Sequence, residues 1–292
     1  MSLILTFDDE AGAGAELAAA LGWSHARIDR HPFPDGETRL RLPPRLPAHV
    51  VLRCSLHRPN GKLTELLLAA AGARELGAQR LTLVCPYLGY MRQDMAFAPG
   101  EVVSQRHMGR LLGATFDHVI TVDPHLHRIA SLDEIMPAGR GVALSAAALL
   151  GAYVGRRLPG AIIVGPDEEA APWARRAAAA GSLQHAVCTK VRHGDREVEV
   201  SMPDQPVRAR PVVLLDDVAS TGGTLVAAAR GLLAAGAASV DVAVTHALFV
   251  GDALEQVRAA GIRHVWSSDS IVHPSNAVSV VPLLSQALVE LR

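Results

Sequence analysis

The stretch Val212–Thr224, VVLLDDVASTGGT, predicts both the fold class and the chemistry of this chain. It begins with four consecutive apolar residues, a pattern that is typical of a parallel strand buried on both faces. We expect the strand to stop at Asp216 and Asp217, and we expect a helix to begin after the small residues that follow. A strand, a short loop and a helix in this order are the repeating unit of parallel α/β proteins.

The loop of this unit has the composition of an anion site. Small side chains let backbone N–H groups converge on an anion, and a helix N-terminus favours negative charge. Two carboxylates would repel a phosphate, but they suit the hydroxyl groups of a sugar beside it. The alternative is a capped helix start with two solvated acids, and the co-occurrence of the acid pair with STGGT disfavours it. The residues expected to contact a sugar phosphate are Asp216, Asp217, Ser220, Thr221, Gly222, Gly223 and Thr224.

Apolar runs alternate with helical patterns over the whole chain, which predicts parallel sheets with right-handed crossovers. The predicted strands are Val50–Cys54, Arg80–Cys85, His118–Val122, Ala161–Val164, Pro211–Leu215 and Val240–Thr245. The predicted helices are Gly61–Leu76, Ser104–Leu112, Glu168–Ala180 and Gly223–Ala235. Polar residues follow several of these strands, where open α/β sheets bind ligands.

A connector rich in proline and glycine, MPAGRG, divides the chain into two halves near residues 138–142. We therefore expect two tandem α/β domains, residues 1–140 and 141–276, each with a mostly parallel sheet flanked by helices. A helix at Pro282–Leu291 is expected to pack back on the first domain as part of residues 277–292. No repeat of fixed period is visible, so that any duplication lies at the level of structure.

The composition is that of an ordinary globular protein, with 49% hydrophobic and 20% charged residues in 292. Lys and Arg total 28 against 29 for Asp and Glu, a balance that disfavours nucleic acid as a partner. The spacing of Cys54, Cys85 and Cys188 fits buried thiols in a reducing compartment better than disulfides or zinc. With no leader and no apolar stretch long enough for a membrane span, a cytoplasmic protein is expected.

Further motifs lie along the chain in a fixed order. They are HPFPDGE at His31–Glu37, PYLGYMRQD at Pro86–Asp94, VDPH at Val122–His125, GPD at Gly165–Asp167, KVR at Lys190–Arg192, VTHALFVGD at Val244–Asp252 and WSSDSI at Trp266–Ile271. Together with the acid pair and its loop, this series resembles the ribose-phosphate pyrophosphokinases over nearly the whole chain. The loop alone resembles the wider phosphoribosyltransferase superfamily, so the resemblance implies two phosphoribosyltransferase-like domains.

The resemblance implies transfer of the pyrophosphoryl group of ATP to ribose 5-phosphate, which gives phosphoribosyl pyrophosphate and AMP. ATP would contact Asp35, Glu37, Arg92 and Gln93, because a guanidinium can hold a triphosphate through paired hydrogen bonds. Mg²⁺ would lie near His125 and Asp167, a role that a lone histidine after a strand would not suggest by itself.

The same resemblance implies that Lys190 and Arg192 are the catalytic cations, which stabilise charge on the transferring group and on the leaving AMP. By spacing alone, a solvated hairpin edge explains KVR equally well. The family assembles with ATP sites at subunit contacts, which implies a homo-oligomer.

Three departures from the family pattern point to an atypical or archaeal-like branch. Met95 and Ala96 stand where the family has two basic residues, and Glu168–Ala170 stand where it has a glycine nearby. Ser220 replaces the aspartate of the main bacterial branch. Two alternatives stay open: a phosphoribosyltransferase, which would not explain PFPDGE or YMRQD, and a non-catalytic regulatory homologue, which the losses at Met95 and Ala96 would allow.

Overall fold

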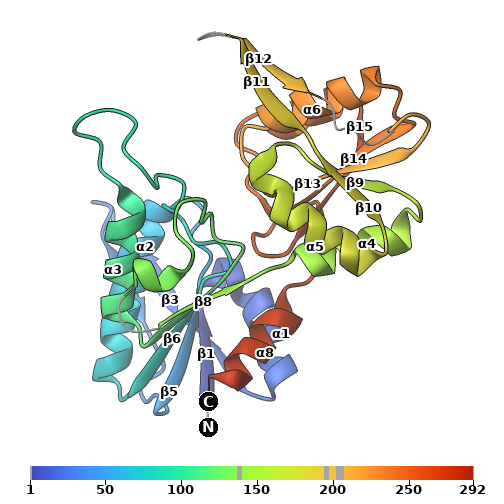
Figure 1. Ribbon diagram of the computed structural model, residues 1–292. Helices are drawn as coiled ribbons and strands as arrows, with labels where there is room; N and C mark the ends of the chain where they lie inside the picture. Colours follow the sequence, from blue (N-terminus) through green and yellow to red (C-terminus); the bar gives the residue numbers. More distant parts are fainter. Residues whose placement is uncertain (1, 137–139, 194–196, 202–206, 292) are drawn as a thin grey trace. The chain divides into compact units, whose positions relative to one another are not determined.

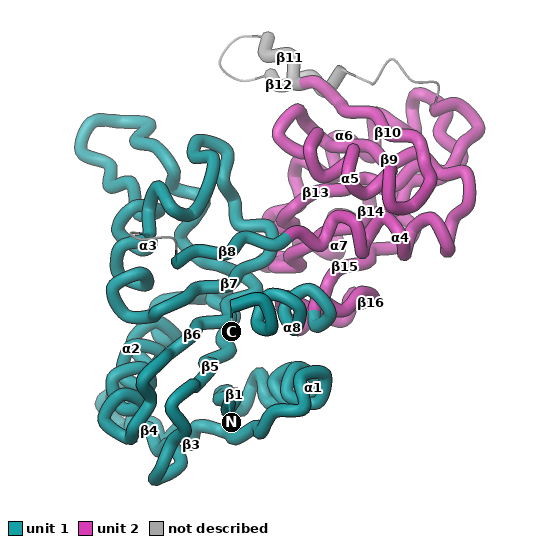
Figure 2. Tube along the Cα trace, turned by 60° about the horizontal axis from the view of Figure 1, so that its bottom comes forward, with its two compact units in different colours: residues 1–144, 281–292 teal, residues 145–280 magenta. Residues whose placement is uncertain are grey.

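The computed structural model describes the backbone of residues 2–136, 140–193, 197–201 and 207–291. It describes the side chains of the same residues except those between 190 and 206. The chain forms two compact units, one of residues 1–144 with 281–292 and one of residues 145–280 (Figure 2). The division falls after residue 144, whereas the sequence placed it after residue 140, and part of the MPAGRG connector lies outside the described residues. No helix among the described residues combines the length and the apolar character that crossing a membrane requires.

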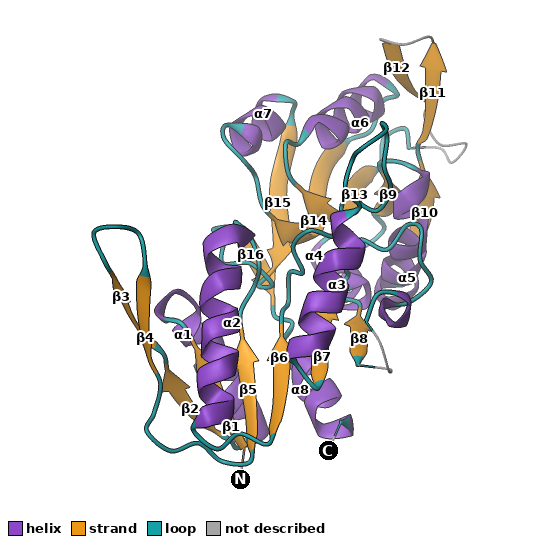
Figure 3. Ribbon diagram, turned by 90° about the vertical axis from the view of Figure 1, so that its left-hand side faces the viewer, coloured by secondary structure: helices purple, strands orange, loops and turns teal. Residues whose placement is uncertain are grey.

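Unit 1 has a six-stranded parallel sheet with the order β2-β1-β5-β6-β7-β8. Its strands are β1 (Ser2–Thr6), β2 (Ser24–Arg27), β5 (His49–Arg53), β6 (Arg80–Val84), β7 (His118–Val122) and β8 (Gly141–Leu144). Helices α2 (Pro59–Glu75) and α3 (Ser104–Thr115) cover one face, and α1 (Ala11–Leu21) and α8 (Val281–Glu290) cover the other (Figures 1 and 3). An antiparallel hairpin, β3 (Asp29–Pro32) with β4 (Thr38–Arg41), extends beyond the β2 edge.

Unit 2 repeats this plan with the sheet order β10-β9-β13-β14-β15-β16. Its strands are β9 (Ile162–Gly165), β10 (Gln184–Val187), β13 (Pro211–Ala219), β14 (Ser239–Ala247), β15 (Ile262–Ser268) and β16 (Asn276–Val278). Helices α4 (Ala147–Arg157) and α5 (Ala171–Gly181) pack on one face, and α6 (Gly223–Ala234) and α7 (Ala253–Ala259) pack on the other. The hairpin here is β11 (Thr189–His193) with β12 (Glu197–Ser201).

Single 3-10 turns add to both units: η1 (Asp8–Glu10) and η2 (Leu132–Glu134) in unit 1, and η3 (Glu168–Ala170) in unit 2. Both units therefore run strand, 3-10 turn, helix, edge strand, hairpin, central strand and helix in the same order. The duplication lies in the structure, while the sequence shows no fixed period.

The C-terminal helix α8 completes this symmetry. It contacts α1 and β8, as α4 contacts α5 in unit 2. In unit 2 the corresponding helix, α4, precedes the first strand of the motif, whereas α8 follows all the other elements of unit 1 in the chain. The chain end returns to cover the sheet face that would otherwise expose apolar side chains to water.

All six predicted strands are confirmed within one or two residues at their starts, because buried parallel strands have continuous apolar runs. The predicted stop of the fifth at Asp216 and Asp217 is wrong, since β13 continues to Ala219. The partner strand β14 is equally long and pairs Asp216 with Val244 and Ala219 with Ala247. Backbone pairing thus carries the strand past the point where its side chains become polar.

The predicted helix Glu168–Ala180 begins later than expected. Its first residues form the 3-10 turn η3, and α5 starts at Ala171 with Pro172 in its first turn. Proline fits the first turn of a helix because it lacks an N–H that would have no partner there. The sequence also left α1 and α4 unassigned, because their many alanines and glycines give a weak apolar pattern.

Helices α4 and α5 approach each other through residues with small or no side chains. A Cβ atom added to Gly151 would lie 1.9 Å from the Ala177 carbonyl oxygen, and one added to Gly181 would lie 2.4 Å from the Gly151 oxygen. Because the obstacles are backbone atoms, no rotamer change could relieve these contacts. Glycine is therefore required where the two helices cross.

We expect Gly151→Ala to lower the free energy of unfolding by at least about 2 kcal/mol, because α4 and α5 must separate to admit the methyl group. Urea or thermal unfolding followed by circular dichroism measures this. Gly12→Ala in α1 is the matched control, since a Cβ at Gly12 meets nothing within 4 Å. It should raise stability by up to about 1 kcal/mol, and equal effects of the two substitutions would contradict the close helix contact.

Candidate active site

The loop Ser220–Thr224 joins β13 to α6 and forms an open helix start. Gly222 has φ 77° and ψ −5°, a left-handed conformation, and no side chain caps α6. The first N–H groups of an α-helix have no partner within the helix and can bind an anion. The backbone of Val250 donates to the Ser220 oxygen at 3.0 Å, which ties this loop to the turn after β14.

The acid pair, Asp216 and Asp217, lies near the end of β13, just before this loop. Asp217 is buried, Asp216 is partly buried, and the Asp217 N–H donates to the Asp216 Oδ1 at 2.9 Å. Burial raises the pKa of Asp216 well above its ordinary value, and repulsion from the carboxylates of Asp217 and Asp167 acts in the same direction. A bound cation or a set of hydroxyl donors would remove this penalty, so that the geometry suits a sugar with a metal ion.

Asp167 directly precedes η3 in an extended conformation, and it is close enough to influence the charge of Asp216. The structure therefore brings a predicted metal ligand and the predicted sugar ligands together in unit 2. Glu168 and Glu169, the acids that depart from the family pattern, are exposed on η3, whereas Ala170 is buried.

The two predicted catalytic cations lie in β11, where Lys190 pairs with Val200 and Arg192 with Val198 across the hairpin. The backbone of this segment thus forms a hairpin, as the alternative interpretation of KVR expects. The positions of both side chains fall outside what the structure describes.

In unit 1, two loops that follow neighbouring strands are held together by one buried amide. Gln105, 1% exposed in α3, donates from Nε2 to the Met91 carbonyl at 3.2 Å and to the His125 carbonyl at 3.2 Å. The backbone N–H of Gln105 also donates to the Gln93 oxygen at 3.3 Å. The predicted nucleotide segment, Arg92–Gln93, is therefore fixed relative to the predicted metal ligand.

A salt bridge supports the same junction. The Arg128 Nε lies 3.4 Å from Asp94 Oδ1, and the Asp94 side chain is nearly buried. Each loop also contains a residue in the left-handed region, Tyr90 with φ 65° and Asp123 with φ 36°. Such strain in residues other than glycine is concentrated at ligand sites, where the surrounding contacts hold it.

The two histidines of the second loop interact directly. His127 Nε2 lies 3.0 Å from His125 Nδ1, and the rings meet edge to face with centroids 3.8 Å apart. His127 thus contacts the Nδ1 edge of His125, the predicted metal ligand.

The segment at Arg92 has a mixed environment. Arg92 is exposed, whereas Gln93 Nε2 donates to the Met95 oxygen at 3.0 Å and to Glu101 Oε2 at 3.3 Å. The Gln93 side chain thus folds its own loop, and the departure at Met95 leaves that contact intact because only the Met95 backbone takes part.

The remaining predicted ATP residues, Asp35 and Glu37, lie on the tip of the β3–β4 hairpin. Both are exposed, and the Glu37 N–H donates to Asp35 Oδ1 at 3.1 Å around Gly36, which has φ 95°. The hairpin follows the edge strand β2, whereas His125 follows β7 near the opposite edge of the sheet. Within unit 1 these acids therefore belong to a different part of the surface from Arg92 and His125.

Sequence reasoning missed Gln105 and Arg128. A signal for Gln105 exists, because it lies on the buried stripe of α3 with Gly109 and Leu112, where an apolar residue is expected. A buried polar side chain requires partners, and here they are two loop carbonyls. Arg128 offers no comparable signal, since an exposed arginine is common.

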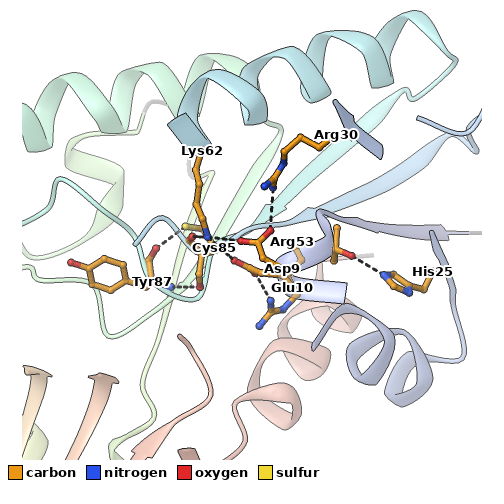
Figure 4. Close-up of polar contacts among 10 residues, drawn as sticks. Asp9, Glu10, His25, Arg30, Arg53, Lys62, Cys85 and Tyr87 are labelled. Atoms are coloured by element: carbon orange, nitrogen blue, oxygen red, sulfur yellow. Dashed lines mark hydrogen bonds and ion pairs between the residues drawn. The ribbon is translucent and has the colours of Figure 1, made fainter. Parts of the chain in front are cut away.

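The cysteines are buried and free, as predicted. Cys85 Sγ donates to the Tyr87 carbonyl at 3.0 Å, and Tyr87 N–H donates to Ser55 Oγ at 3.2 Å (Figure 4). Burial raises the pKa of the Cys54 thiol to about 12, and the nearby Glu10 carboxylate adds to this effect. These thiols are therefore protonated packing groups rather than nucleophiles.

Comparison with known proteins identifies relatives along the whole chain. A family model described as the N-terminal domain of ribose phosphate pyrophosphokinase matches residues 3–115, and one described as a phosphoribosyl transferase domain matches residues 131–283. The chain is 36% identical over 289 residues to a ribose-phosphate pyrophosphokinase of Methanopyrus kandleri, covering 98% of both chains. It is 32% identical over 279 residues to one of Thermococcus kodakarensis, covering 95% of both.

A solved structure shows the same fold. The crystal structure of phosphoribosylpyrophosphate synthetase from Mycobacterium smegmatis matches 99% of this chain and 98% of its own, with a TM-score of 0.84 and 23% identity. The predicted fold class, two tandem phosphoribosyltransferase-like α/β domains, is confirmed, and so is the predicted family.

We expect Asp216→Asn to stabilise the protein without ligands or metal at neutral pH. The folded protein raises the pKa of Asp216 above the 3.8 of an ordinary aspartate. The native state therefore binds this proton more tightly than the unfolded state, and stability is lost as pH rises through the raised pKa. Thermal unfolding between pH 4 and pH 8 should show a gain for the variant that is largest at the high end and vanishes near pH 4.

Asp252→Asn is the matched control for this experiment, because Asp252 is exposed before α7. Asparagine and aspartate are equally good at a helix N-cap. The control should therefore shift the melting temperature little at any pH. A stability gain of Asp216→Asn that is the same at pH 4 and pH 8 would argue against a raised pKa.

Proposed function

The chain belongs to the ribose-phosphate pyrophosphokinase family, and we propose that its two units divide the substrates between them. The protein is a ribose-phosphate diphosphokinase: it transfers the pyrophosphoryl group of ATP to ribose 5-phosphate and produces phosphoribosyl pyrophosphate and AMP. In our proposal, unit 2 binds ribose 5-phosphate and unit 1 binds ATP.

The observation that carries the sugar assignment is the uncapped start of α6 beside the acid pair. The 5-phosphate would accept hydrogen bonds from the N–H groups of Ser220–Thr224 and from the hydroxyls of Ser220, Thr221 and Thr224. Asp216 and Asp217 would accept hydrogen bonds from ribose hydroxyl groups. Gly222 is required here because a Cβ would lie 3.0 Å from Val257 Cγ2 and because its φ is positive.

ATP would bind through Arg92 and Gln93, on the loop that Gln105 fixes to the His125 carbonyl. Asp35 and Glu37, on the hairpin at the other edge of the sheet, would serve the ATP site of a neighbouring chain. This arrangement requires a homo-oligomer, in which the exposed acids on the hairpin tip would reach a nucleotide bound to another chain.

Mg²⁺ suits the donor set that the chain offers. Magnesium prefers oxygen ligands and keeps several waters. The carboxylates of Asp167 and Asp217 lie close enough to Asp216 to raise its pKa. We propose Asp167 as the Mg²⁺ ligand of unit 2 and His125 as the candidate Mg²⁺ ligand of unit 1, each directly or through a water. The ion would neutralise phosphate charge during the transfer.

Lys190 and Arg192 would stabilise the charge that develops on the transferring group. Phosphoryl-type transfers depend on positioning and electrostatic stabilisation more than on a general base. Lys190 and Arg192 lie two residues apart in β11.

We expect AMP release from MgATP that depends strictly on ribose 5-phosphate, with phosphoribosyl pyrophosphate formed in equal amount. Chromatographic separation of AMP, ADP and ATP after incubation measures this. ADP as the nucleotide product would indicate transfer of a single phosphoryl group. No AMP at any ATP concentration, with folded protein, would contradict the pyrophosphoryl transfer itself.

Lys190→Ala is the matched variant for the catalytic role. It should reduce turnover on the order of 10³-fold, because a cation that acts in the transition state is lost. Binding of ribose 5-phosphate, measured by calorimetry, should stay nearly unchanged. An equal loss of sugar binding and turnover would assign Lys190 to substrate binding instead.

Gln105→Met should raise the KM for ATP roughly tenfold and leave the affinity for ribose 5-phosphate unchanged. Methionine keeps the volume of the side chain but removes the donor that two buried carbonyls share, a loss of about 1–3 kcal/mol. Steady-state kinetics with each substrate varied in turn separates the two effects.

Gln286→Met, on the exposed side of α8, makes the same chemical change where only Glu290 Oε1 accepts the bond at 2.9 Å. It should leave both KM values unchanged. If Gln105→Met instead lowered the apparent affinity for both substrates equally, Gln105 would be a general stability residue rather than one that positions the nucleotide loop.

A further inference from the structure

The 3-10 turn η1 and the loop after β5 have the same places in unit 1 as η3 and the sugar-phosphate loop have in unit 2. The parallel pairing of β1 with β5 sets Thr6 beside Arg53, and the pairing of β9 with β13 sets Val164 beside Leu214. In each unit the 3-10 turn therefore follows the strand that neighbours the loop-bearing strand.

A buried carboxylate occupies this place in unit 1. Glu10 Oε1 accepts a hydrogen bond from the Ser55 N–H at 2.7 Å and lies 3.4 Å from Lys62 Nζ, while Oε2 forms a close ion pair with Arg53 (Figure 4). The carboxylate thus has one backbone N–H and two cations around it. This is the donor set by which proteins bind small anions.

The burial of this cluster is unusual. The side chains of Glu10 and Arg53 are 4% and 3% exposed, and Arg53 Nε has no hydrogen-bond partner among the described residues. Such a pair is costly to desolvate, and loss of one partner leaves an uncompensated buried charge. Nothing in the proposed sugar or nucleotide site uses these residues.

The corresponding position in unit 2 has no carboxylate. Ala170 is the last residue of η3, as Glu10 is the last residue of η1, and both are buried. In unit 2 the acids instead come from β13, at Asp216 and Asp217. The two units thus differ at the last residue of the 3-10 turn, which is Glu10 in unit 1 and Ala170 in unit 2.

We propose that unit 1 contains an internal anion site at the end of β5, in the place that Asp216 has in β13 of unit 2, and that Glu10 is its built-in occupant. The carboxylate satisfies Arg53, Lys62 and the Ser55 N–H from within the chain.

The occupied site also supports the nucleotide loop. Lys62 Nζ donates to the Ser55 carbonyl at 3.0 Å, Ser55 Oγ accepts from Tyr87 at 3.2 Å, and Leu56 N–H donates to the Tyr87 carbonyl at 2.8 Å. Tyr87 begins the turn that leads to Arg92. The internal anion thus holds the loop after β5 against the loop after β6.

The test is rescue of Glu10→Ala by acetate, which replaces the deleted carboxylate. In chloride buffer the variant should melt well below the wild type, because Arg53 loses its partner. Replacing chloride by acetate at about 0.1 M and constant ionic strength should raise its melting temperature by about 3 °C or more. The wild type should show no such difference between the two salts.

Two variants control the result. Glu10→Gln fills the same space and should show no gain from acetate. Asp8→Ala removes an equal charge from the exposed end of η1, where Asp8 pairs with Arg27 at 3.5 Å, and should behave as the wild type.

An acetate effect on Glu10→Ala no larger than on Asp8→Ala would overturn the proposal. If Glu10→Ala is insoluble when expressed, refolding from urea in each salt decides the question. Recovery in acetate but not in chloride supports an anion site, and equal recovery or equal failure in both salts refutes it.

Discussion

The parallel pairing of the first strand of each unit with its loop-bearing strand, β1 with β5 and β9 with β13, is the constraint on which the site depends. Parallel strands present their carboxyl ends at one edge of a sheet. The pairing therefore sets each 3-10 turn beside a strand–helix loop. In unit 2 it brings Asp167 to Asp216, and in unit 1 it brings Glu10 to Arg53.

Electrostatics distinguishes the two copies of this arrangement. In unit 1 the buried carboxylate of Glu10 is neutralised by Arg53 and Lys62. In unit 2 burial and neighbouring carboxylates raise the pKa of Asp216, which favours a proton, a cation or hydroxyl donors there. The same fold thus holds a carboxylate with two cationic partners in unit 1 and a cluster of carboxylates in unit 2.

Rigid support for the nucleotide loops comes from groups that touch no proposed ligand. The Gln105 amide binds the Met91 and His125 carbonyls, and Arg128 pairs with Asp94. Loops that carry ligand residues must keep their geometry without a dense core of their own, and buried hydrogen bonds to backbone carbonyls achieve this. The family's exposed cations are replaced at Met95 and Ala96, but this scaffold does not involve their side chains.

The sequence alone determined six strands of the two sheets, the alternation of α and β elements, the acid pair and the small-residue loop, because apolar runs and helix-start chemistry are local properties. The family also followed from motifs in the sequence, and their order supplied the reaction. VVLLDDVASTGGT indicated a sugar phosphate before any coordinates.

Tertiary structure decided the rest. Only strand pairing could extend β13 through Asp216 and Asp217 to Ala219, since β14 supplies the backbone partners. Only packing could show that Gln105 joins two loops, that α8 completes unit 1, and that Glu10 contacts Arg53, Lys62 and the Ser55 N–H. These features depend on residues that are far apart in the chain. Their charges and hydrogen-bonding groups become partners only when folding buries them beside one another.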